Sequence, residues 1–214
     1  MNLGILILEF ALLLPAIVVH EVSHGWVAYL LGDPTARNSG RLSLNPLKHI
    51  DPFGTIILPA LLLVGSGGQA AFGYAKPVPI NPHYFKDYRW GMFLSAIAGP
   101  TSNLAMALIA SVILRIFGLT NYVLLGVYYF ALINLILLFF NLIPIPPLDG
   151  SRVIPLFLSD RGVQVYHEFE RYGFVILLVL LWVVPMLLPG VSPISSYLNA
   201  TVYRLVPILT GVPA

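Results

Sequence analysis

Residues 3–31 read LGILILEFALLLPAIVVHEVSHGWVAYLL, an apolar stretch in which the charged residues are Glu9 and Glu21. The stretch is longer than the roughly 20 residues that cross the ~30 Å hydrocarbon core of a bilayer. A charged side chain at the centre of such a span costs on the order of 2.5–3.5 kcal/mol and usually marks function. The cluster of His20, Glu21 and His24 therefore makes this span the first place to look for a functional site.

The composition of the whole chain indicates a polytopic membrane protein. Of its 214 residues, 58% are hydrophobic and 9% are charged, whereas a soluble domain carries roughly 25% charged residues. The absence of cysteine excludes disulfides and thiolate metal sites, so a bound metal would need His and carboxylate ligands. A net charge of +2 is too small to suggest a nucleic-acid partner, and the expected surroundings are the lipid bilayer of the cell membrane.

We expect an all-α polytopic membrane protein with about five transmembrane helices, folded as one domain. The domain comprises residues 1–214, with a core at 3–155 and an additional helix and tail at 156–214. Long apolar spans are predicted at 2–31, 90–114, 121–143 and 172–190, and the tail 191–214 reads as interfacial or as a weak last segment.

Two further segments are ambiguous in sequence. Residues 53–75 are uncharged but broken by Pro59 and several glycines, which fits either a span or a re-entrant hairpin. Residues 41–45 alternate polar and apolar side chains, which predicts a short β-strand at the membrane edge. A loop at the membrane surface is the equal alternative for 41–45.

The distribution of basic residues favours the re-entrant alternative. If 53–75 returns to its own side, nine basic residues share one side and Arg115 lies opposite, whereas a spanning 53–75 splits the basic residues four against six. The positive-inside rule then places the nine-residue side in the cytoplasm and the N-terminus outside. The nine are Arg37, Arg41, Lys48, Lys76, Lys86, Arg89, Arg152, Arg161 and Arg171.

His20, Glu21 and His24 form an HExxH motif, which on a helix binds zinc. Residues four apart lie on one helix face, so His20 and His24 can hold one ion. Glu21 can then serve as general base toward a water on that ion. The alternative is two histidines hydrogen-bonded across helices with Glu21 as their partner, which would leave buried ionisable groups without a functional reason.

A catalytic zinc site needs a third protein ligand, and Asp149 is the strongest candidate among nine acids. It follows Pro144, Pro146 and Pro147, which cannot continue a helix, so the span must unwind beside it. Unwound backbone at membrane depth is tolerated where it lines a wet cavity or is buried in protein. Taken alone, a solvated Asp149 in a proline-rich turn is equally reasonable. His49, among turn residues at the membrane surface, is a weaker candidate ligand.

Three motifs in order resemble the site-2 protease family of intramembrane zinc metalloproteases. They are HEVSH at 20–24, GPTSN at 99–103 and NLIPIPPLDG at 141–150. The resemblance implies one catalytic Zn²⁺ held by His20, His24 and Asp149, with Glu21 as general base. It also implies that Asn141 holds the substrate backbone or the oxyanion, although an Asn bonded to a neighbouring helix is nearly as good a reading.

The same resemblance gives Asn103 a role in helix packing, and matches the compact prokaryotic form of the family, without PDZ or CBS domains. It implies an endopeptidase whose substrates are membrane proteins with a transmembrane helix, cleaved in regulated intramembrane proteolysis. The rivals from the residues alone are a metal transporter or metal-sensing membrane protein, and an inactive homologue that binds helices. The site is expected to open toward the cytoplasm, and the oligomeric state is not indicated.

Overall fold

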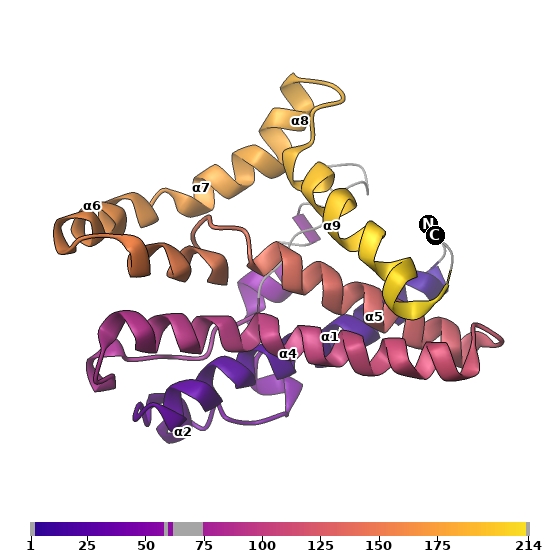
Figure 1. Cartoon of the computed structure of the whole chain (residues 1–214), viewed down its shortest axis with the longest axis horizontal. Coiled ribbons are helices and arrows are strands. Elements are labelled where there is room, and N and C mark those ends of the chain that lie inside the picture. The colour runs from indigo at the N-terminus through magenta and orange to yellow at the C-terminus, as the bar shows by residue number, and fades with distance from the viewer. Residues whose placement is uncertain (1–2, 58–59, 62–74, 213–214) are drawn as a thin grey trace.

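The computed structural model describes residues 3–57, 60–61 and 75–212 (Figure 1). The described residues are helical and contain no strand. Three long helices form the body of the molecule, and shorter ones follow them. The helices are α1 (Leu3–Leu30), α2 (Thr35–Asn38), η1 (Pro46–Lys48), η2 (Pro52–Ile57), η3 (Pro82–Tyr84), α4 (Tyr88–Phe117), α5 (Tyr122–Asn141), η4 (Asp149–Phe157), α6 (Asp160–Glu170), α7 (Gly173–Leu178), η5 (Val179–Val183), α8 (Val184–Leu187) and α9 (Pro193–Thr210).

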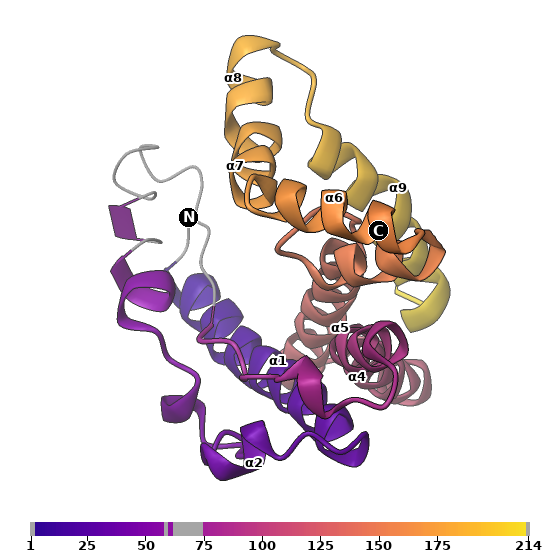
Figure 2. The same ribbon diagram turned by 90° about the vertical axis from the view of Figure 1, so that its left-hand side faces the viewer.

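The long helices α1, α4 and α5 pack side by side, with α4 antiparallel to the other two (Figures 1 and 2). As a result, α1 ends and α4 begins toward the same end of the molecule, and α5 runs toward that end but stops short of it. Local sequence sets the bounds of α4: the side chain of Asp87 accepts a hydrogen bond from Trp90 N at its start. Gly118, at φ +66°, ends it in a conformation that suits glycine.

The C-terminal third of the chain bends back over α5. Helices α6 and α7–α8 meet at 59°, and α9 crosses α5 and α4 (Figure 1). Val202 and Val206 of α9 are buried against Ala107 of α4 and Leu135 and Leu138 of α5. This apolar cluster joins α9 to the two long helices at the half of the molecule away from the end of α1.

The helices long and apolar enough to span a membrane agree in part with the sequence prediction. Three qualify, at Phe10–Leu30, Tyr88–Phe117 and Tyr122–Asn141, and the bent α6–α8 unit makes a fourth if it is counted as one span. The predicted number of about five is therefore not reached among the described residues. Most of the segment 53–75, predicted to span or to re-enter the membrane, lies outside the described residues. The polypeptide leaves α1 and enters α4 toward the same end of the molecule.

The β-strand predicted at 41–45 is not confirmed. A strand needs a neighbouring strand for its backbone groups. Here Arg41 N donates to the Ala36 carbonyl at 2.9 Å, and the Ser43 carbonyl oxygen lies 2.8 Å from His49 Nε2. The Arg41 guanidinium donates to the Lys76 carbonyl at 2.6 Å. The segment is thus held as an irregular loop.

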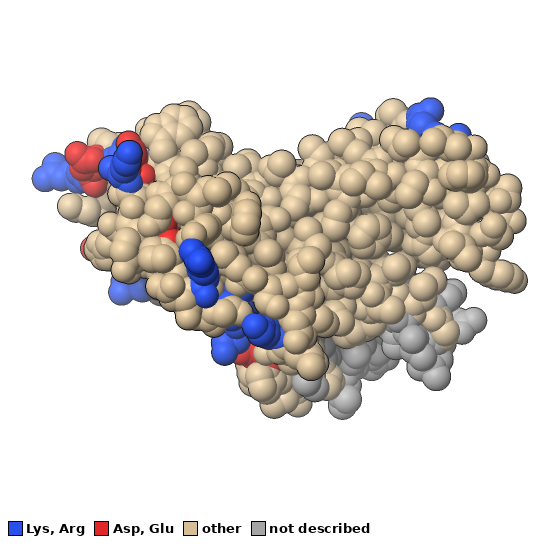
Figure 3. All heavy atoms as spheres, turned by 90° about the horizontal axis from the view of Figure 1, so that it is seen from below, with Lys and Arg blue, Asp and Glu red and all other residues tan. Residues whose placement is uncertain are grey.

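Charged side chains gather at the two ends of the molecule. On the face shown in Figure 3, most Lys and Arg side chains lie toward the end that carries α2 and α6, and a smaller group lies at the opposite end. The surface between them is uncharged apart from a few residues. This pattern fits a protein whose middle is surrounded by hydrocarbon.

Candidate metal centre

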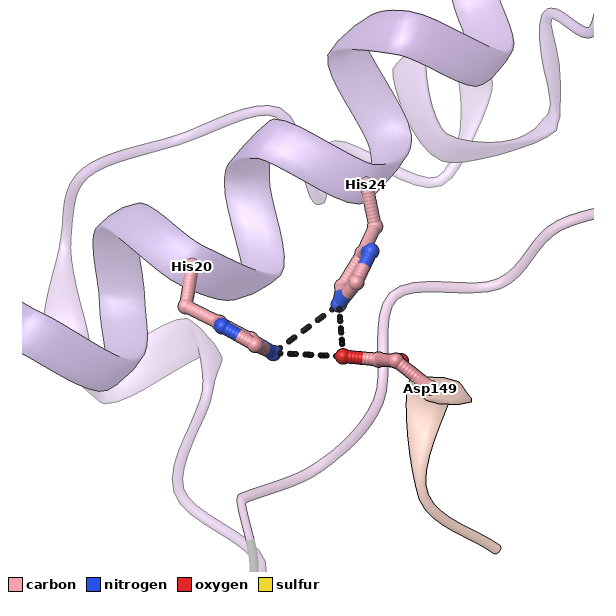
Figure 4. Close-up of side chains that lie close together, drawn as sticks. All are labelled: His20, His24 and Asp149. Atoms are coloured by element: carbon pink, nitrogen blue, oxygen red, sulfur yellow. Dashed lines mark hydrogen bonds and ion pairs between the residues drawn. The ribbon is translucent and has the colours of Figure 1, made fainter. Parts of the chain in front are cut away.

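His20, His24 and Asp149 converge on one point (Figure 4). The two histidines project from one face of α1, and Asp149 begins η4 after the end of α5. His20 Nε2 and His24 Nε2 lie 3.1 and 3.3 Å from Asp149 Oδ2, and 3.0 Å from each other. Both imidazoles are buried, so this polar group lies in the interior of the helix bundle.

The proline-rich segment after α5 brings Asp149 back toward α1. Helix α5 ends at Asn141, and Pro144, Pro146 and Pro147 prevent it from continuing. The turn that follows is tight, since a Cβ on Gly150 would lie 2.3 Å from the Leu142 carbonyl oxygen. Only glycine allows the backbone at residue 150 to approach the Leu142 carbonyl this closely. Gly150 therefore helps to fix the position of the adjacent Asp149.

The Nδ1 atoms of both histidines are held by residues of α4. His24 Nδ1 lies 2.8 Å from the Ser95 carbonyl oxygen, which can only accept a hydrogen bond, so Nδ1 carries the proton. His20 Nδ1 lies 2.5 Å from Asn103 Oδ1. In the neutral tautomer each Nε2 then has a free lone pair. Two lone pairs and a carboxylate oxygen then face one another, an arrangement that could hold a metal ion.

The spacing of these three atoms fits zinc. Ligand atoms at about 2.0–2.1 Å from a tetrahedral ion lie roughly 3.3 Å apart, and the separations here are 3.0, 3.1 and 3.3 Å. Asp149 Oδ2 is buried and has no hydrogen-bond partner. A third ligand from another segment leaves the fourth position open, as catalytic zinc sites require.

An amide chain behind His20 was not foreseen from the sequence, where Asn103 was assigned to helix packing. Asn103 is fully buried and, besides contacting His20, donates from Nδ2 to Asn134 Oδ1 at 2.8 Å. Asn134 donates in turn to the Phe130 carbonyl at 2.9 Å. These two amide side chains link α1, α4 and α5 and fix the His20 ring. The feature of the sequence that could have indicated them is an asparagine within each of two apolar spans.

Gly99 is the second feature that sequence reasoning missed. A Cβ there would lie 2.4 Å from His24 Nε2 and 2.6 Å from His20 Cε1. The glycine lets α4 approach the imidazoles closely enough for Ser95 and Asn103 to reach them.

The other predicted site residues lie as follows. Glu21, half-buried, accepts a hydrogen bond at Oε2 from Val78 N at 3.0 Å. Asn141 donates from Nδ2 to the Leu137 carbonyl of its own helix at 3.0 Å. His49 is buried and bonds the Ser43 carbonyl, and it does not belong to the His20, His24 and Asp149 group.

A helical membrane protein with an HExxH helix and a carboxylate beside its histidines belongs to the class of membrane metallopeptidases. Sequence comparison agrees. Residues 118–184, which include Asp149, match the model of peptidase family M50. YwhC of Bacillus subtilis, named as a candidate zinc metalloprotease, is 39% identical over 194 residues, or 86% of this chain and 80% of that protein.

Rip2 of Mycolicibacterium smegmatis, also named as a candidate zinc metalloprotease, is 29% identical over 83% of this chain and 68% of its own length. MJ0611 of Methanocaldococcus jannaschii is 35% identical over 44% of this chain. No solved structure matches. The chain belongs to peptidase family M50, the site-2 protease family, which confirms the resemblance seen in the sequence. It is a metalloendopeptidase with zinc as its cofactor.

Proposed function

We propose that this protein is an intramembrane endopeptidase that hydrolyses peptide bonds in or near transmembrane helices of membrane-protein substrates. His20, His24 and Asp149 hold the zinc ion, Glu21 is the general base, and Asn141 binds the substrate. The observation that carries the proposal is the convergence of three lone-pair atoms from the HExxH helix and the proline-rich segment, 3.0–3.3 Å apart.

The depth of the site supports a substrate cleaved within the membrane. Helix α1 ends at Leu30, so at 1.5 Å per residue His24 and His20 lie about 9 and 15 Å from that end. The hydrocarbon core is ~30 Å thick, which puts the site between the centre of the bilayer and one face. A substrate helix must unwind locally to reach it, because helical hydrogen bonds cover its peptide bonds.

Each residue has a defined part in the proposed hydrolysis. Bound zinc would polarise the scissile carbonyl and lower the pKa of the attacking water. Glu21 takes the proton of that water and passes it to the leaving amine. Ser95 and Asn103 keep the imidazoles in the tautomer that leaves Nε2 free, and Asn141, at the end of α5, donates to the substrate backbone.

We further propose that the site opens toward the cytoplasm and that the N-terminus lies outside. Helix α1 ends and α4 begins toward one end of the molecule, and α5 runs toward that end. The segments at that end carry nine of the eleven basic residues. The positive-inside rule favours the cytoplasm for such an end, and water would reach the site from there.

The decisive experiment is cleavage of a library of internally quenched single-span transmembrane peptides by the purified protein. Glu21→Gln should lower kcat by roughly 10²–10⁴-fold, the usual contribution of a general base, and Asp149→Asn should lose both cleavage and zinc. Glu9→Gln, the matched control on the same apolar stretch, should cleave normally. Normal cleavage by either site variant would refute the assignment. Bound zinc with no cleavage of any peptide would favour an inactive helix-binding protein.

A further inference from the structure

Residues 76–81, Lys-Pro-Val-Pro-Ile-Asn, form an extended segment that we call the strap. It lies against the C-terminal half of α1, where Val78 is 6% exposed. A Cβ added to Gly25 would lie 2.6 Å from Val78 Cγ1, so the strap is in direct contact with the helix turn that carries His24. Nothing in the sequence reading assigned it a role.

The strap presents one backbone donor to the site. Pro77 and Pro79 have no N–H group, so Val78 is the only donor between Lys76 and Ile80. That amide donates to Glu21 Oε2 at 3.0 Å. An extended segment with proline on both sides is stiff, which makes Val78 N a fixed point rather than an adaptable contact.

Buried groups hold the strap at both ends. At its start, Arg41 donates to the Lys76 carbonyl at 2.6 Å, and Lys76 N donates to the His49 carbonyl at 2.9 Å. At its end, Asn81 N donates to Asp33 Oδ2 at 2.7 Å. Arg41 is 8% exposed and Asp33 is fully buried. Burying two charges is costly unless they are well paired, so these anchors indicate that the position of the strap is tightly specified.

We propose that the Val78 backbone amide is a positioning group for Glu21, and that Arg41 and Asp33 act on the site through the strap. The amide holds Oε2 and leaves Oε1 to receive the proton. A general base must stand within about 2.6–3.2 Å of its proton donor, and a misplacement of about 1 Å can cost a hundredfold in rate. This inference rests on the proposed role of Glu21 as general base.

Val78→Pro tests the proposal, because it removes the single N–H while keeping an extended backbone between two prolines. Val78→Ala removes the same packing on Gly25 and keeps the N–H, so its kcat is the reference. Relative to Val78→Ala, we expect Val78→Pro to lower kcat roughly ten- to hundredfold, the contribution of a hydrogen bond to a charged group. KM and zinc content should stay the same, since the zinc ligands are untouched.

A second pair of variants changes the anchor at the start of the strap, and it tests the proposal even if Val78→Pro does not fold. Arg41→Met removes the anchor on the Lys76 carbonyl and should lower kcat roughly tenfold, whereas Arg41→Lys retains a charged donor and should recover most of that loss. All variants are assayed on the peptide of the library that the native protein cleaves best.

Equal kcat for Val78→Pro and Val78→Ala, or for Arg41→Met and Arg41→Lys, would overturn the positioning role. Glu21→Gln in the same assay separates this outcome from failure of the proposed function. If Glu21→Gln is inactive while the paired variants match, the base assignment stands and only the strap proposal fails.

Discussion

Gly99→Ala adds one methyl group in α4 at its contact with the two imidazoles. The new Cβ would lie 2.4 Å from both Cε1 and Nε2 of His24, and 2.6 Å from Cε1 of His20. Ordinary contacts begin at 3.4 Å, so His24 must move by at least about 1 Å, against a ligand tolerance of roughly 0.2 Å in zinc sites. We expect zinc affinity to fall by more than tenfold, and cleavage to fall with it.

The same substitution favours the helix itself, since alanine is about 1 kcal/mol better than glycine in a helix interior. Loss of zinc should therefore occur in a protein that still folds. Bound zinc is measured by competition with a chelator in detergent, and folding by thermal unfolding and circular dichroism of the zinc-free protein.

The matched control is Gly126→Ala in α5, where an added Cβ has no neighbour within 4 Å. It should leave zinc affinity and cleavage at native values. If folded Gly99→Ala binds zinc within about twofold of the native protein, α4 does not constrain the imidazoles and the geometry derived for the site is wrong.

Three further outcomes follow from the contacts of the site. Asn103→Leu leaves His20 Nδ1 without its acceptor and should weaken zinc binding about ten- to hundredfold, measured by chelator competition. Gly150→Ala brings a methyl group to 2.3 Å from the Leu142 carbonyl and should displace Asp149; unchanged zinc affinity would contradict the tight turn. Removing zinc with 1,10-phenanthroline should abolish cleavage, and added zinc should restore it; activity that persists after verified removal of the metal would exclude a zinc-dependent mechanism.

Some of the site could be predicted because it depends on local geometry. The spacing of His20 and His24 places both on one helix face whatever the rest of the fold. The prolines after Asn141 end α5 for covalent reasons, and the acid that follows them is the one that the structure brings to the histidines.

Other parts could not be predicted from one sequence. Asn103 and Asn134 look alike as polar residues in apolar spans, and only the packing of α4 between α1 and α5 joins them to His20. Residues 41–45 have the alternation of a strand, but the bonds made by Arg41 and Ser43 give them another arrangement. Glu170 of α6 pairs with Arg152 of η4 at 3.0 Å, a contact that no local sequence pattern indicates.

The sequence by itself determined that this chain enters a membrane, that its first span places two histidines on one helix face, and that a proline-rich segment with Asp149 follows a later span. These properties follow from composition, helix period and the covalent structure of proline. The tertiary structure decided which atoms surround the site: Ser95 and Asn103 behind the histidines, Gly99 beneath them, and Val78 on Glu21. Such contacts depend on how closely helices approach, which side-chain volumes at their crossings set.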